Sequence, residues 1–138
     1  MTTFPSTEWF EAVQAAANDD RDFRNLGTCF AQVGVRVGER VFLLDFEAFE
    51  CAGVSEADET ALHDVDFALN MSSGEWRRLL NNIRENGGAD SENTFNTLDI
   101  EHGIVESPNP YGMNNFPRYH LTIQRFFDVS SGIETTFA

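Results

Sequence analysis

The sequence contains no lysine, and nine arginines stand against 23 aspartates and glutamates. The absence of lysine excludes mechanisms that form a Schiff base or use lysine as a general base. The formal net charge of −14 argues against a basic patch that could displace counterions from nucleic acid or an anionic membrane. We therefore expect no nucleic-acid partner and no membrane insertion.

Cysteine is scarce, and long hydrophobic runs are absent. With 138 residues and two cysteines, the chain is long enough to fold around one core without disulfides or metal. No apolar stretch approaches the roughly 20 residues of a membrane-spanning helix. Residues 1–5 lack the basic and apolar regions of a signal peptide. We expect a single domain over residues 1–138 and a cytoplasmic location.

Phenylalanine, by contrast, is abundant, with 13 residues beside two tryptophans. Such rings bury large apolar areas, and this excess has two interpretations. The rings fill the core, or some of them line a cavity for a ligand.

Residues 6–18 have the pattern of an amphipathic helix. Ser6 is a suitable N-cap, and Glu8 lies in the first turn, where the helix dipole favours an acid. One stripe of the predicted helix is apolar: Trp9, Phe10, Val13, Ala16 and Ala17. Phe23 and Leu26 indicate a further short turn that packs on the core.

The clearest pattern is a β-hairpin over residues 28–49. A two-residue turn at Gly38-Glu39, with glycine first as a type II′ turn requires, aligns apolar side chains on one face. The predicted pairs are Val37 with Arg40, Val35 with Phe42, Val33 with Leu44, Ala31 with Phe46, and Cys29 with Ala48. We expect the other face to be exposed to water; it carries Arg36, Gly34, Gln32, Asp45 and Glu47.

In this register Cys51 lies opposite Leu26, about 10 Å along the ladder from Cys29. That separation exceeds the reach of a disulfide, so both thiols are expected to be reduced. Residues 53–64 read as an acidic connector.

A third strand is predicted over residues 65–71, where apolar and polar residues alternate. Ser72 and Glu75 then have the spacing of a capping box, and they begin a helix whose buried face is Trp76, Leu79, Leu80 and Ile83. Asn86-Gly87-Gly88 ends this helix. The rest of the chain predicts a short helix at residues 95–100, an edge strand at 103–106, a loop at 107–112, a terminal helix from Asn115 with Pro117 in its first turn, and a loosely held tail at 130–138.

This order of elements describes an α+β domain with an antiparallel or mixed β-sheet and helices packed on one face. Four local motifs occur in this order: the opening Ser6-Thr7-Glu8-Trp9, the hairpin 33–46, the strand Asp66-Phe67-Ala68-Leu69 and the helix start Ser73-Gly74-Glu75-Trp76. Together they resemble the sterol carrier protein 2 (SCP2-like) domain family. The resemblance covers residues 6–84, and the family's Gly-Lys-Leu-x-Ile-x-Gly strand is absent beyond them.

The resemblance implies a hydrophobic tunnel between sheet and helices that takes sterols, fatty acyl chains or similar lipids, without catalysis and without a cofactor. An inward arginine could hold a ligand carboxylate at the mouth. The residues that we expect to contact the ligand are Phe42, Leu44, Phe67, Trp76, Leu80, Phe95, Phe116, Tyr119, Ile123, Phe127 and Arg118.

A second hypothesis is a small cofactor-independent enzyme of the isomerase, cyclase or hydratase type. His120 or Tyr119 would act as acid or base, with Asp99 and His102 as further candidates. The segment 99–102 lacks a second histidine or cysteine at ligand spacing, so no metal site is expected.

A third hypothesis is an oligomerising accessory subunit. Phe126 and Phe127 are adjacent, and successive helical residues diverge by roughly 100°, so one ring could fill the core while the other meets a partner chain. Exposure of Phe127 would favour a homodimer.

Overall fold

A computed structural model describes residues 2–108 and 110–138. Its strands are β1 (Thr2–Phe4), β2 (Ala31–Val37), β3 (Arg40–Glu47), β4 (Glu50–Ala57), β5 (Phe67–Met71), β6 (Val105–Glu106) and β7 (Thr135–Phe137). Its α-helices are α1 (Thr7–Asn18), α2 (Arg21–Asn25), α3 (Ser73–Asn86), α4 (Phe95–His102), α5 (Pro110–Met113) and α6 (Asn115–Asp128). Two short 3-10 helices are η1 (Glu59–His63) and η2 (Val129–Gly132). The predicted loop at 107–112 includes residue 109, which lies outside the described residues.

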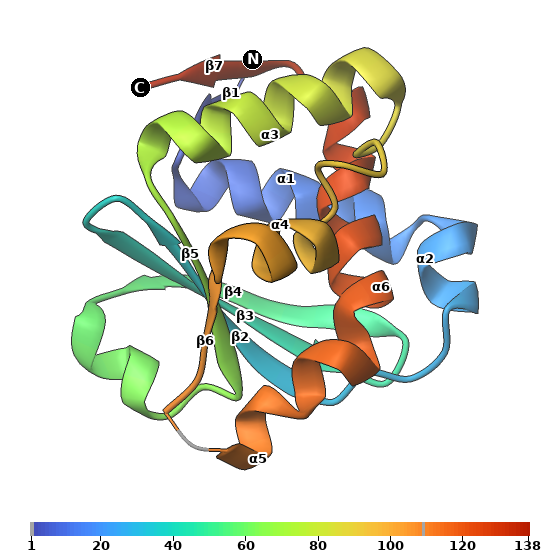
Figure 1. Ribbon diagram of the computed structural model, residues 1–138. Helices are drawn as coiled ribbons and strands as arrows, with labels where there is room; N and C mark the ends of the chain where they lie inside the picture. Colours follow the sequence, from blue (N-terminus) through green and yellow to red (C-terminus); the bar gives the residue numbers. More distant parts are fainter. Residues whose placement is uncertain (1, 109) are drawn as a thin grey trace.

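A five-stranded mixed sheet in the order β4-β3-β2-β5-β6 supports a layer of helices that includes α1, α3, α4 and α6 (Figure 1). β2, β3 and β4 form an antiparallel meander, whereas β5 runs parallel to β2. The α+β fold class predicted from the sequence is therefore confirmed. None of the helices in the described ranges combines the length and the hydrophobicity needed to cross a membrane.

The hairpin register is the predicted one. Val35 lies opposite Phe42 and Val33 opposite Leu44. Gly38 has a φ of 61°, the positive value that the first position of a type II′ turn requires. The alternation of apolar and polar residues was sufficient to predict the register of the hairpin, because a shift of one residue would turn every apolar side chain towards solvent.

The predicted acidic connector is partly wrong, because its first residues continue the sheet. A second tight turn at Ala48, with a φ of 53°, leads into β4, which pairs with β3. Cys51 consequently lies opposite Phe46 and not opposite Leu26. Both cysteines are nevertheless free and buried.

The second face of the sheet is only partly exposed to water. Asp45 and Glu47 are exposed as predicted, but Gly34 is buried. A Cβ atom at position 34 would lie 2.5 Å from Cδ2 of Leu62 and 3.1 Å from Cβ of Ala68. Glycine therefore lets the segment that carries η1 pack closely against this face.

The capping residues predicted from the sequence begin and end the helices. The Ser72 hydroxyl accepts a hydrogen bond from the Glu75 backbone N–H at 3.2 Å, and the Glu75 carboxylate accepts one from the Ser72 N–H at 3.0 Å. Gly87 ends α3 in the left-handed conformation with a φ of 69°. At α1, the Ser6 hydroxyl accepts from the Trp9 N–H at 3.1 Å.

Two predictions about tertiary packing are corrected by the structure. The short turn after α1 is α2, and its Phe23 packs in the core as predicted, but Leu26 is 43% exposed. The tail is not loose, because β7 pairs in parallel with β1, with Thr2 opposite Thr135 and Phe4 opposite Phe137. We call this pair of strands the terminal ribbon; in Figure 1 it lies beside α3.

The adjacent rings of Phe126 and Phe127 are both fully buried. Phe126 meets Phe46 with ring centroids 5.4 Å apart, and Phe127 meets Trp76 at 5.3 Å. Core residues contact α6 on two sides, so both rings pack in the core although they point in different directions. The exposed Phe127 that would have favoured a homodimer is not observed.

Arg125 of α6 and Asp20 form a two-pronged ion pair, with nitrogen–oxygen distances of 2.8 and 2.9 Å. The Arg125 guanidinium lowers the pKa of Asp20, so the pair stabilises the fold above the ordinary pKa of an aspartate and loses this effect as pH falls.

We predict that Arg125→Gln lowers the free energy of unfolding by about 1 kcal/mol at pH 7. Urea unfolding followed by tryptophan fluorescence measures this, and the difference should shrink towards pH 3. Equal losses for Arg125→Gln and for the exposed Arg21→Gln would contradict the role of the pair.

The pKa of Asp128 is shifted in the opposite direction to that of Asp20. Burial raises the pKa of its carboxyl, although that group accepts hydrogen bonds from Gln124 and from the Ala89 N–H. A raised folded-state pKa gives a contribution that is present at low pH and is lost as pH rises through that pKa. Asp128→Asn keeps an acceptor oxygen without the buried charge. We expect this variant to gain stability on the order of 1 kcal/mol at pH 7 and little at pH 3, as measured by thermal unfolding. A loss of stability at pH 7 would show that the ionised carboxylate is needed.

Candidate functional site

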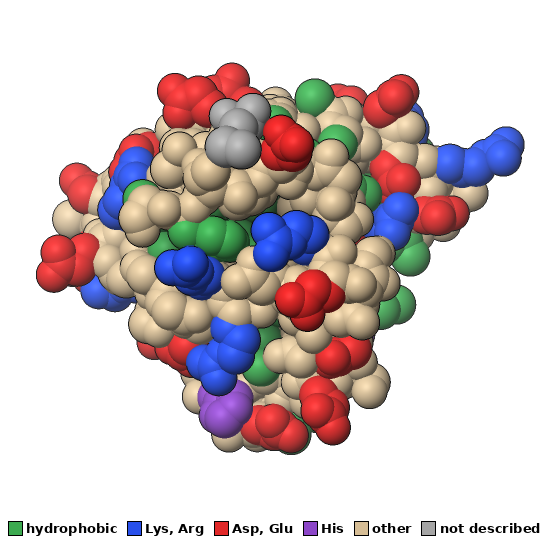
Figure 2. Space-filling model, turned by 90° about the horizontal axis from the view of Figure 1, so that it is seen from above, with side chains coloured by type: hydrophobic (Ala, Val, Ile, Leu, Met, Phe, Trp, Pro, Cys, Tyr) green, Lys and Arg blue, Asp and Glu red, His purple; other side chains and the backbone are tan. Residues whose placement is uncertain are grey.

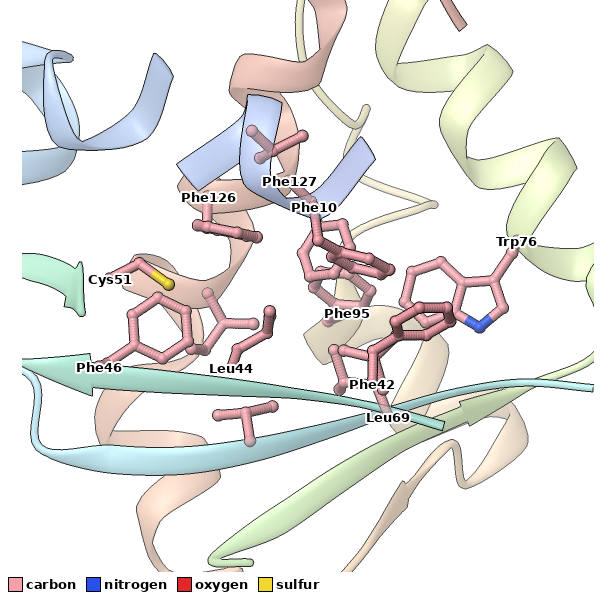
Figure 3. Close-up of a cluster of buried hydrophobic side chains, with 14 of the residues drawn as sticks. Phe10, Phe42, Leu44, Phe46, Cys51, Leu69, Trp76, Phe95, Phe126 and Phe127 are labelled. Carbon is pink, nitrogen blue, oxygen red and sulfur yellow. The ribbon is translucent and has the colours of Figure 1, made fainter. Parts of the chain in front are cut away.

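The space between the sheet and the helices, where the sequence predicted a ligand, is occupied by aromatic rings (Figure 3). Phe10 meets Phe42 with ring centroids 4.7 Å apart, and Phe127 meets Phe95 at 5.2 Å. The Trp76 Nε1–H donates to the Arg36 carbonyl at 2.8 Å. Seven of the predicted ligand-contacting residues have no exposed surface: Phe42, Leu44, Phe67, Trp76, Phe95, Ile123 and Phe127. All seven belong to the buried hydrophobic cluster that forms the core.

The other predicted ligand-contacting residues lie at the edges of this core. Leu80, Phe116 and Tyr119 are buried, with at most 8% of their surface exposed. Arg118 is exposed, and its guanidinium lies 5.2 Å from the centre of the Tyr119 ring. The second arginine of α6, Arg125, is held by Asp20.

The four candidate acid–base residues do not converge. Asp99 and His102 lie on α4, whereas Tyr119 and His120 lie on α6. The Asp99 carboxylate accepts the Val105 N–H at 2.9 Å, and His102 is exposed. Within residues 2–108 and 110–138, no hydrogen bond joins any two of these four side chains. The arrangement offers no shared proton-transfer site.

The two thiols are also unsuited to nucleophilic chemistry. Burial raises the pKa of Cys29 and of Cys51 to about 12, so both stay protonated near neutral pH. No group of three or more histidine, cysteine, aspartate or glutamate side chains is placed to hold a metal ion within the described part of the chain.

Two hollows that a ligand could enter lie on either side of α3. One, with a volume of about 440 Å³, lies between α3 and α4 and is rimmed by charged and polar side chains, among them Glu75, Arg78, Glu101 and His102. The other, about 490 Å³, lies between α3, the terminal ribbon and the tip of the β2–β3 hairpin. We call it the terminal groove. Its lining residues are Phe4, Pro5, Val37, Gly38, Glu39, Arg40, Ser73, Gly74, Arg77, Phe137 and Ala138.

The terminal groove has an apolar floor and a charged rim. Phe4 and Val37 belong to the buried core and are 2% exposed. Phe137 of β7 packs on this core, and its ring centroid lies 6.2 Å from that of Phe4. Arg40 and Arg77 lie at the rim. Figure 2 views the molecule from the side of α3 and the ribbon, and shows hydrophobic side chains at the bottom of a hollow with basic side chains beside it.

Sequence reasoning missed this groove because both ends of the chain build it. One signal was present: the tripeptide Thr-Thr-Phe occurs at residues 2–4 and again at 135–137. The two copies pair residue for residue. The Trp9 Nε1–H also donates to the Thr135 hydroxyl at 3.0 Å, which fixes the ribbon to α1.

Comparisons with known proteins bear on the fold. No protein-family model matches the sequence, and no curated protein matches it. Among solved structures, the crystal structure of sterol carrier protein 2 superposes with a TM-score of 0.68 at 14% sequence identity, covering 94% of this chain and 98% of that one. The chain therefore has the α+β fold seen in sterol carrier protein 2.

Proposed function

We propose that the protein binds a hydrophobic small molecule, such as a sterol, a fatty acyl chain or a similar lipid, and does not transform it. The observation that carries the proposal is the terminal groove, whose volume of about 490 Å³ lies within the roughly 300–1,000 Å³ of small-molecule sites. The fold seen in sterol carrier protein 2 supports the same class of function. Burial of apolar ligand surface contributes about 25 cal/mol per Å², which is sufficient for micromolar binding after the cost of association.

Phe4 separates the groove from the residues that the sequence predicted to contact ligand. Its ring centroid lies 6.1 Å from that of Trp76 and 6.0 Å from that of Phe10. A ligand in the groove therefore rests on Phe4, and contact with Phe42, Trp76 or Phe127 requires the Phe4 ring to move. We infer that a small ligand stays in the groove, while a larger one displaces Phe4 and reaches the predicted set.

Gly74 allows a direct test, because a Cβ atom added there meets no atom closer than 4.0 Å. Gly74 is exposed in the first turn of α3 and lines the groove, so Gly74→Trp should fill the hollow without disturbing the core. We expect the parent protein to bind the fluorescent lipid cis-parinaric acid with micromolar affinity and Gly74→Trp to bind it about tenfold more weakly, as measured by fluorescence titration.

The matched control is Glu85→Trp, an exposed position on the same helix that does not line the groove. It should bind as the parent does. A parent protein that binds no lipid probe would overturn the proposed function. Equal affinities of the parent and Gly74→Trp would place the ligand elsewhere.

A further inference from the structure

We propose that the terminal groove takes an amphiphile with an anionic head group, and that Arg77 is the residue that selects it. This inference rests on the proposed function, because it names the class of ligand for the same groove. A neutral molecule of equal size and apolar surface should bind less well.

Arg40 also lines the groove, but three of the five N–H donors of its guanidinium are used within the protein. Its Nε and Nη2 atoms donate to the two carboxylate oxygens of Glu56, each at 2.9 Å. Its Nη1 donates to the Pro5 carbonyl at 2.7 Å. Arg40 therefore holds the hairpin and the chain preceding α1 together, and its charge is neutralised by Glu56.

Arg77 is different. It is exposed on α3, and no carboxylate within the described ranges forms an ion pair with it. Its guanidinium lies 5.2 Å from the centre of the Phe137 ring. This cation–π contact places the charge over the groove and leaves the N–H edge of the guanidinium available to an acceptor.

Six of the nine arginines form no ion pair within the described ranges, and Arg77 is the one of these six that lines the groove. Among the described residues that line the groove, Glu39 is the acidic one, and it is exposed on the hairpin turn. The groove thus carries a cation on its α3 side without a salt bridge. An anionic head group would supply the ion pair that no side chain in the described part of the chain provides.

The apolar floor of the groove indicates the chemistry of the rest of the ligand. The Phe137 ring contacts both the Arg77 guanidinium, at 5.2 Å, and the Phe4 ring, at 6.2 Å. A molecule with its head group on Arg77 would therefore place its apolar tail on the rings of Phe137 and Phe4. Such a ligand matches both the charge and the hydrophobicity of the groove, whereas a fully apolar molecule leaves Arg77 unpaired.

The experiment compares cis-parinaric acid with its methyl ester, which has the same tail and no charge. Fluorescence titrations at pH 8 would use the parent chain, Arg77→Gln, Arg77→Lys and Arg78→Gln. Arg78 is the matched control, because it is the next residue, equally exposed, and lines the cleft on the opposite side of α3.

We expect the parent to prefer the acid over the ester about fivefold, the magnitude of an ion pair at an exposed site. Arg77→Gln should weaken binding of the acid to the level of the ester and so abolish the preference, Arg77→Lys should restore part of it, and Arg78→Gln should leave it unchanged. Binding of both probes without preference, or a preference that survives Arg77→Gln, would overturn the role of Arg77 while the proposed function stands. Binding of neither probe would overturn both.

Discussion

The packing of aromatic rings between the sheet and the helices is the constraint on which the rest of the structure depends. Phe127, on α6, meets the rings of Trp76, Phe95 and Phe10 with centroid distances of 5.3, 5.2 and 6.3 Å. Rings at these separations gain edge-to-face and dispersion energy as well as hydrophobic burial. Because they fill the space between the two layers, the accessible apolar surface lies at the margin of the core.

The terminal ribbon forms the accessible apolar surface at this margin of the core. Phe4 belongs both to the core and to the floor of the terminal groove, and its partner Phe137 forms one wall. The ribbon is short, and its β7 residues are only half-buried. It is fixed by backbone pairing and by the hydrogen bond from Trp9 to Thr135. The integrity of the site is therefore coupled to the attachment of both ends of the chain.

Much of the fold could be predicted from the sequence, because its strongest signals are local. The turn at Gly38 and the capping box of Ser72 and Glu75 depend on a few adjacent residues, and the alternation in β2 and β3 fixes their register. β4 was not predicted because this edge strand, with the sequence Glu-Cys-Ala-Gly-Val-Ser-Glu-Ala, has little apolar alternation. Its strand conformation comes from pairing with β3.

The candidate site was less predictable, because its location depends on tertiary packing. The sequence indicated which rings would be apolar and buried, but periodicity cannot tell a ring that lines a cavity from one that fills it. The arginine proposed for the ligand was Arg118, yet the arginines that line the terminal groove are Arg40 and Arg77. Arg77 contacts the terminal ribbon through the ring of Phe137, and the two strands of this ribbon come from opposite ends of the chain.

The central claim is that ligand binds in the terminal groove, at the margin of a filled core. Chemical-shift mapping of the backbone amides during titration with a lipid small enough to stay in the groove, such as octanoic acid, tests it most directly. The account predicts that the largest changes fall on Gly38, Gly74 and Phe137, with small changes around Phe95 and Phe127. Large changes confined to α4 and α6, with the groove amides unaffected, would contradict it.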